Sequence, residues 1–243
     1  MPSQKSFEEI KDSSNPEEIN EFLIELAQNP KEAYFSIIDY FLNTLSSSLL
    51  DDVRVNLFYL IGELALTSRL PQNYLDFLKS QYISSDRWER NEIIKAFKTI
   101  VKHQRLQRKY VDLIATAVKE DYTSLKVNAF ECLTEIQNIR DKNLKKILLA
   151  ININKSEILK KARKILKREI LNQDHLFKLL NDDEFYKSID KIAIRTILMT
   201  FFNTVMRVES FRERIDNSDW KDPAKQIFLD EIDTYEKILL KNR

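Results

Sequence analysis

Asp51–Leu66, DDVRVNLFYLIGELAL, is the stretch of sequence that decides the fold. Its apolar residues recur at three- and four-residue spacing, which is the pattern of an amphipathic helix. Gly62 lies in the middle of the stretch and is the only glycine among 243 residues. Glycine inside a helix costs about 1 kcal/mol relative to alanine. We therefore predict that Gly62 permits a close helix approach, where Phe58 and Tyr59 supply bulk nearby.

The same pattern returns along the chain. Its copies are VRVNLFYLIGEL (53–64), ERNEIIKAFKTI (89–100), LKVNAFECLTEI (125–136), ILKKARKILKRE (158–169) and IRTILMTFFNTV (194–205). Four copies have a basic residue in second place, and the 158–169 copy does not. Self-similarity at a period of roughly 33–37 residues, with two helices in each unit, is typical of an α-solenoid.

The repeats resemble the HEAT-repeat (armadillo-like) superfamily, in which the second helix of a unit begins Val-Arg and continues with small or apolar residues. Val53, Arg54, Ile61 and Gly62 match this pattern, while the bulky Leu57 stands where a small residue is usual. The resemblance covers residues 31–208. It implies an all-α fold, a right-handed α-solenoid of about five HEAT-like helix pairs with extra N- and C-terminal helices.

We expect one domain over residues 15–243, preceded by a poorly ordered segment over 1–14. The repeats are predicted at approximately 31–67, 72–103, 106–138, 142–171 and 174–208, with a C-terminal helix over 223–241. Within them, amphipathic runs bounded by prolines and polar turns predict helices. Their ranges are 16–28, 31–46, 51–67, 72–83, 87–103, 106–119, 124–138, 142–151, 156–171, 174–181, 189–208 and 223–241.

The composition excludes several classes of protein. A chain with one glycine and five prolines lacks the turn residues that sheets need and the glycine-rich loops that bind nucleotides. The single cysteine, Cys132, cannot form an internal disulfide, which favours a reducing, cytoplasmic compartment. The polar N-terminus is unlike a secretory signal, and no apolar run is long enough to span a membrane. His103 and His175 are each isolated, so we expect neither a metal site nor a cofactor.

Charge is unevenly distributed along the chain. Residues 1–52 carry a net charge of −8, residues 53–172 carry +11 and residues 173–243 carry −2. The densest basic segment is 140–168. We take its cations as a candidate surface for an acidic partner, or alternatively as a solvated helix face: Lys142, Lys145, Lys146, Lys160, Lys161, Lys164, Lys167 and Arg168.

The basic residues in second place form a ladder through the repeats, made of Arg54, Arg90, Lys126 and Arg195. In HEAT solenoids the equivalent side chain typically reaches an acid and locks neighbouring units together. The resemblance therefore implies a structural role for the ladder, and a basic row that faces a ligand is the alternative.

The function expected first is a non-catalytic scaffold or adaptor that binds a protein partner on a curved helical surface. The alternative is a nucleic-acid-binding protein that uses the basic residues within 53–172. A third hypothesis comes from the DNA alkylpurine glycosylases, which are HEAT-like enzymes with a W-x-x-x-D element. Trp88 and Glu92 match that element loosely, and the next unit offers no clear arginine. The sequence predicts neither the partner's identity nor the oligomeric state.

Overall fold

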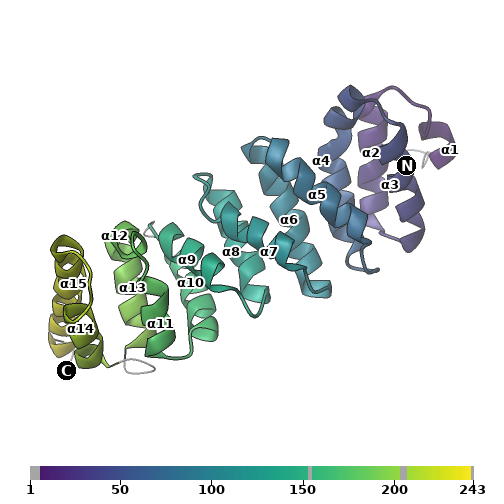
Figure 1. Cartoon of the computed structure of the whole chain (residues 1–243). Helices are drawn as coiled ribbons and strands as arrows, with labels where there is room; N and C mark the ends of the chain where they lie inside the picture. Colours follow the sequence, from purple (N-terminus) through teal and green to yellow (C-terminus); the bar gives the residue numbers. More distant parts are fainter. Residues whose placement is uncertain (1–5, 153–154, 203–206, 242–243) are drawn as a thin grey trace. The chain divides into compact units, whose positions relative to one another are not determined.

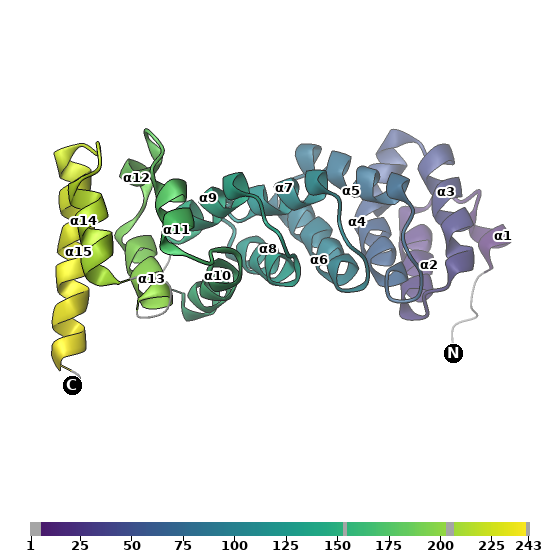
Figure 2. The ribbon, with the colours of Figure 1, turned by 60° about the horizontal axis from the view of Figure 1, so that its bottom comes forward.

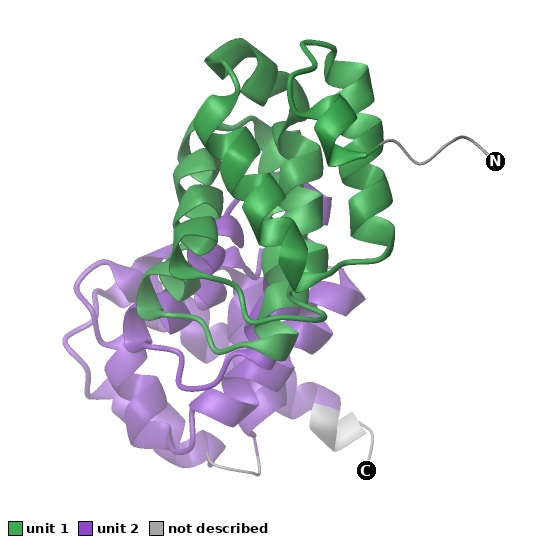
Figure 3. Ribbon diagram, turned by 90° about the vertical axis from the view of Figure 1, so that its right-hand side faces the viewer, with its two compact units in different colours: residues 1–113 green, residues 114–243 purple. Residues whose placement is uncertain are grey.

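The computed structural model describes residues 6–152, 155–202 and 207–241, with side chains up to residue 238. This part of the chain is 77% helical and contains no strand, which confirms the all-α prediction. Contacts divide the chain into two compact units, residues 1–113 and 114–243 (Figure 3). Each unit is described by itself below.

Three long helices form a row in the first unit: α2 (Pro16–Gln28), α4 (Ser47–Leu64) and α6 (Arg87–His103) (Figure 1). α4 packs extensively against both α2 and α6. Shorter elements form a second layer, in which α3 packs on α4 and α5 packs on α6 (Figure 2). The elements of this layer are α1 (Phe7–Ile10), the 3-10 turn η1 (Glu32–Tyr34), α3 (Phe35–Thr44) and α5 (Gln72–Ser84). α7 (Arg108–Ala117) spans the boundary between the two units.

The second unit repeats this plan. Its row consists of α8 (Thr123–Glu135), α10 (Ser156–Glu169), α13 (Lys191–Phe201) and α15 (Asp222–Lys241), each packed against the next. Shorter helices lie beside the row: α9 packs on α10, α11 on α9, and α14 on α15. They are α9 (Asp141–Ala150), α11 (Gln173–Leu180), α12 (Phe185–Ser188) and α14 (Val208–Asp216).

Hydrogen bonds recur at one repeat's separation. In the first unit Tyr74 donates its hydroxyl to Asp39 Oδ1 at 2.8 Å, and Tyr110 does the same to Asp76 Oδ1 at 2.9 Å. Both phenols are half-buried or buried, and burial is the main cause that raises the pKa of Tyr110 to about 12. In the second unit Arg195 bonds Glu231, 36 residues ahead. The Tyr–Asp contact therefore occurs twice in the first unit, and the Arg195–Glu231 contact of the second unit spans a similar sequence separation.

Most predicted helices are present, and local capping explains where they begin. Asn15 accepts the Glu17 amide proton ahead of Pro16, and the Asp86 carboxylate accepts the amide protons of Trp88 and Glu89. α4 begins four residues before the predicted start because the Ser46 hydroxyl caps it, accepting from the Leu49 amide at 3.3 Å.

Four further predicted ranges differ from the structure by more than two residues. The segment predicted as poorly ordered contains α1, a single turn closed by a capping box between Ser6 and Glu9; residues 1–5 lie outside the described part. The helix predicted over 31–46 is divided into η1 and α3. The helix predicted over 124–138 ends at Glu135. The helix predicted over 189–208 ends at Phe201 within the described residues, and α14 starts at Val208 beyond the undescribed 203–206.

Candidate interaction surfaces

The two ends of the ladder make equivalent ion pairs. In the first unit Arg54 on α4 makes two bonds to Glu89 on α6, at 2.8 and 2.9 Å, and a third to Asp51. In the second unit Arg195 on α13 makes two bonds to Glu231 on α15, at 2.6 and 3.2 Å. Each arginine therefore joins its helix to the next helix of the row, and its guanidinium is occupied by a carboxylate.

The middle of the ladder is different. The Arg90 guanidinium donates to the Tyr82 carbonyl at 3.0 Å and lies over the Tyr82 ring, 5.3 Å from its centroid. Lys126 is only 4% exposed, and burial lowers the pKa of its ammonium, an effect that Asp121 opposes. None of the four residues presents an unoccupied cation on an open surface.

The structure does not bring the eight predicted basic residues onto one face. Lys142, Lys145 and Lys146 lie on α9, and the other five lie on α10. α10 packs mainly against α8 and α13 of the row, and α9 packs beside it on α10 and α11.

Five of the eight side chains have interaction partners in the described part of the chain, and Lys142 is one of them. On α9, Lys145 is paired with Asp182, and Lys146 donates to the Thr116 hydroxyl at 2.7 Å. On α10, Lys161 pairs with Glu131 at 3.2 Å and with Glu157 at 3.1 Å.

Arg168 has a structural role. It donates to the carbonyls of Leu133, Thr134 and Ile136 at the end of α8, and to Glu169. The last carbonyls of a helix have no partner within the helix, and a basic side chain there supplies one. This contact supplies partners for the carbonyls at the end of α8, and it removes Arg168 from the candidate surface.

Three lysines remain, and we call them the α10 lysine stripe: Lys160, Lys164 and Lys167. They are exposed and fall at four- and three-residue spacing on one side of the helix. Within the described residues no carboxylate pairs with any of them. Arg163 borders the stripe and donates to the Met199 carbonyl of α13 at 3.1 Å. The stripe is the part of the predicted basic surface that stays available to an anion.

A second surface was not predicted from the sequence. The outward sides of α2 and α4 expose three apolar side chains, Ile24, Val55 and Tyr59, to 39, 37 and 46%. Carboxylates stand among them at helical spacing, and we call the whole set the α2–α4 face. Its acidic members are Glu17, Glu21, Asp52 and Glu63. The net charge of −8 over residues 1–52 was the signal in the sequence, but it did not indicate which side chains share a face.

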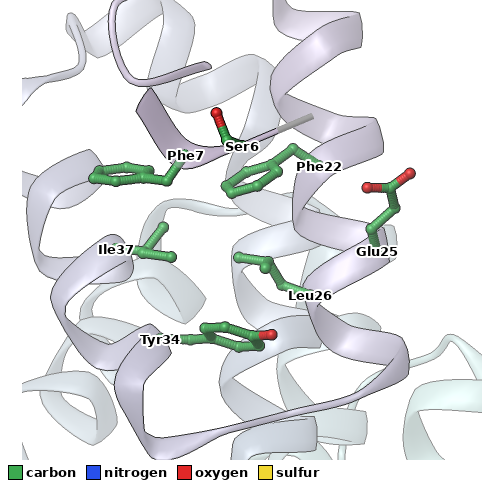
Figure 4. A pocket seen from close by; sticks show the side chains of 7 residues that line it. All are labelled: Ser6, Phe7, Phe22, Glu25, Leu26, Tyr34 and Ile37. Carbon is green, nitrogen blue, oxygen red and sulfur yellow. The ribbon is translucent and has the colours of Figure 1, made fainter. Parts of the chain in front are cut away.

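A shallow cavity of about 360 Å³ lies between α1, α2 and the η1–α3 segment (Figure 4). Its walls are mainly apolar, and Phe7 stacks on Phe22 at one side with ring centroids 6.4 Å apart. The polar groups of the lining are the Ser6 and Tyr34 hydroxyls and the Glu25 carboxylate. This lining contains no nucleophile paired with a base.

The residues of the glycosylase hypothesis lie at the start of α6. Trp88 is 56% exposed, with the Arg87 guanidinium 5.3 Å from its ring centroid, so it does not pack in the core. Glu92 pairs with Lys95 of the same helix at 2.8 Å. Over the described ranges, no three His, Cys, Asp or Glu side chains are grouped so that they could hold a metal ion. Nor does any helix there combine the length and the apolar character that crossing a membrane would require.

Comparisons with known proteins provide a likeness in fold. No family model matches the chain, and no curated protein matches it. Among solved structures, the crystal structure of an engineered protein is similar, with a TM-score of 0.50 and 14% sequence identity. The alignment covers 96% of this chain and 98% of that one. At this identity the likeness concerns the helical fold alone.

Proposed function

We propose that the protein is a non-catalytic scaffold, a right-handed α-solenoid of HEAT-like helix pairs that holds a protein partner on the outward side of its helix rows. Support for the solenoid comes from contacts that recur at one repeat's separation, such as Tyr74–Asp39 and Tyr110–Asp76. Stacked helix pairs bury a continuous core and leave an extended surface for a partner. The cytoplasmic location expected from the lone Cys132 belongs to the same proposal.

The α2–α4 face is the observation that carries the proposal. An exposed apolar residue by itself is ordinary, whereas apolar and aromatic side chains gathered on one face and rimmed by charge are typical of protein interaction sites. Ile24, Val55 and Tyr59 form such a group. Arg54, which precedes Val55 in the sequence, is already bound to Asp51 and Glu89.

Photo-crosslinking in cells tests this function. A photoreactive residue placed at Tyr59 should give a discrete crosslinked band that mass spectrometry identifies as a protein. The same residue at Ser80, which is exposed on α5 in the other layer, is the control. Absence of a band at Tyr59, or the same bands from both positions, would contradict the proposal.

The α10 lysine stripe favours a second candidate function, the binding of a nucleic-acid backbone. Three unpaired lysines on one helix side offer the contacts that phosphates accept, and the affinity should fall steeply with salt because counterions are released. The triple substitution K160E/K164E/K167E should abolish binding of duplex DNA at low salt. The matched control K102E/K119E/K237E changes the net charge equally at scattered exposed lysines. Equal losses in both variants would contradict a specific site.

A further inference from the structure

The exposed residues of α2 and α4 form two neighbouring lines. On α2 the exposed positions are 17, 21, 24 and 28, and on α4 they include 52, 55 and 59. Each line follows the three- and four-residue spacing that places side chains on one side of a helix. Other residues of α4 face the neighbouring helices. Asn56 turns towards α2, and Arg54 turns towards α6.

Two hydrogen bonds fix the register of these lines. Asn56 Nδ2 donates to Asn20 Oδ1 at 2.7 Å, and Asn20 Nδ2 donates to the Asp52 carbonyl at 3.2 Å. α3 follows α2 in the sequence and reverses the direction of the chain, and α4 reverses it again. α2 and α4 therefore point the same way. One turn beyond the Asn20–Asn56 pair, Ile24 is therefore level with residue 60, between Tyr59 and Glu63. This register makes one apolar strip of Val55, Tyr59 and Ile24.

The charges around the strip have one sign. Apart from Arg54, neither helix contains a lysine or an arginine, and the Arg54 guanidinium is bound to carboxylates. Among the described residues, no basic side chain pairs with any of the four carboxylates of the α2–α4 face. Glu63 is half-buried, and burial raises the pKa of its carboxyl. A cation brought to the face would therefore meet several uncompensated carboxylates at once.

We propose that the α2–α4 face binds a basic amphipathic helix of a partner protein. The helix would lay apolar side chains, spaced three and four residues apart, on the strip of Val55, Tyr59 and Ile24. Its lysines and arginines would reach the carboxylates on both sides of the strip. This inference rests on the proposed scaffold function and specifies the class of partner.

Other occupants fit the surface less well. An anionic membrane or a nucleic acid would be repelled by the four carboxylates. A second copy of the chain offers the α10 lysine stripe, but that stripe carries lysines at all three of its positions and no apolar side chain that could cover Tyr59. Charge and apolar pattern together select a segment that is both basic and amphipathic.

The test uses the full-length chain and a synthetic 18-residue helix with leucines at positions i, i+3, i+4 and i+7 and lysines at most of the remaining positions. Fluorescence anisotropy measures its binding at two salt concentrations. A peptide of the same composition in scrambled order, and one with glutamate in place of lysine, are the controls. The amphipathic basic peptide should bind at least tenfold more tightly than either control, and more weakly at high salt.

Two sets of variants locate the site. Val55→Ser with Tyr59→Ser removes the apolar strip, and Glu17→Gln, Glu21→Gln and Asp52→Asn remove charge. Each set should weaken binding at least tenfold. Glu135→Gln with Glu157→Gln, two exposed carboxylates of the second unit, should leave it unchanged. Because all these positions are exposed and outside the core, circular dichroism melts should show that every variant remains folded.

Three results would overturn the inference. They are equal binding of the scrambled peptide, unchanged binding by both sets of variants, or a concentration-dependent dimer in sedimentation that Tyr59→Ser abolishes. The scaffold proposal has a separate readout, because a crosslink from residue 59 to a partner without a basic amphipathic helix would keep the scaffold and reject this class of partner. Loss of the crosslink together with loss of peptide binding would reject both.

Discussion

Gly62 of α4 lies directly against Ala96 of α6. A Cβ added to Gly62 would stand 3.0 Å from the Ala96 Cα and 3.2 Å from its Cβ. Contacts this short are tighter than most real Cβ contacts, so Ala96 would have to give way by a few tenths of an ångström. The close approach predicted from the only glycine in the chain is confirmed, and its partner is the next helix of the row.

Gly62→Ala should therefore destabilise the first unit. Alanine gains about 1 kcal/mol of helix propensity, but forcing a methyl group into a tight interface costs about 1–3 kcal/mol. We expect a net loss of about 1 kcal/mol in the free energy of unfolding, measured by urea denaturation. Adding Ala96→Gly should recover part of this loss once the effect of Ala96→Gly alone is subtracted. A gain in stability from Gly62→Ala would show that α4 and α6 separate at no cost.

The ion pair between Arg54 of α4 and Glu89 of α6 should have a larger coupling energy than the more exposed pair between Lys95 and Glu92, which both lie on α6. Its side chains are 18 and 16% exposed, against 49 and 34% for Lys95 and Glu92. A bidentate arginine pair shielded from water contributes about 1.5–3 kcal/mol, whereas exposed pairs contribute about 0.2–1 kcal/mol. Double-mutant cycles with Arg54→Met and Glu89→Gln, and with Lys95→Met and Glu92→Gln, measure the difference. Equal coupling energies would contradict the prediction that Arg54 holds α4 against α6.

Arg168→Met should separate stability from anion binding. The arginine caps the end of α8 through three carbonyls, so its loss should lower the free energy of unfolding by about 2 kcal/mol. Lys164→Met, at an exposed position one turn away on α10, should change stability by less than about 0.5 kcal/mol. Duplex binding at low salt should respond in the opposite order, with Lys164 the more sensitive. The prediction fails if Arg168→Met leaves the denaturation midpoint unchanged.

Glu63 should make the stability of the first unit decrease as the pH rises. Burial raises the pKa of its carboxyl above the ordinary 4.5, so the folded state holds the proton at a pH where the unfolded state has released it. Stability from this group is therefore present at low pH and declines as pH rises above 4.5 and through the raised pKa. The difference in unfolding free energy between Glu63→Gln and the wild type should grow in favour of glutamine over that window. A free-energy difference that stays constant across this pH window would contradict the prediction.

The helices were largely predictable because their determinants are local. Asn15 with Pro16, and Asp86 with Glu89, fix helix starts through side chains only a few residues away. The ends were less predictable where the deciding contact is distant. α8 stops at Glu135, and its last carbonyls are bound by Arg168, which lies more than 30 residues further along the chain.

The candidate surfaces also depend partly on local sequence and partly on contacts between distant residues. The sequence by itself determined an all-helical chain, the repeat and the segregation of charge, because spacing and composition are properties of neighbouring residues. Only the tertiary structure decided that Lys145, Lys161 and Arg168 are engaged while Lys160, Lys164 and Lys167 are not. It also decided that Ile24 joins Val55 and Tyr59, since the hydrogen bonds of Asn20 with Asn56 and with the Asp52 carbonyl set the register of α2 and α4. Which side chains remain available to a partner depends on contacts between helices, and those contacts are not encoded at any one position.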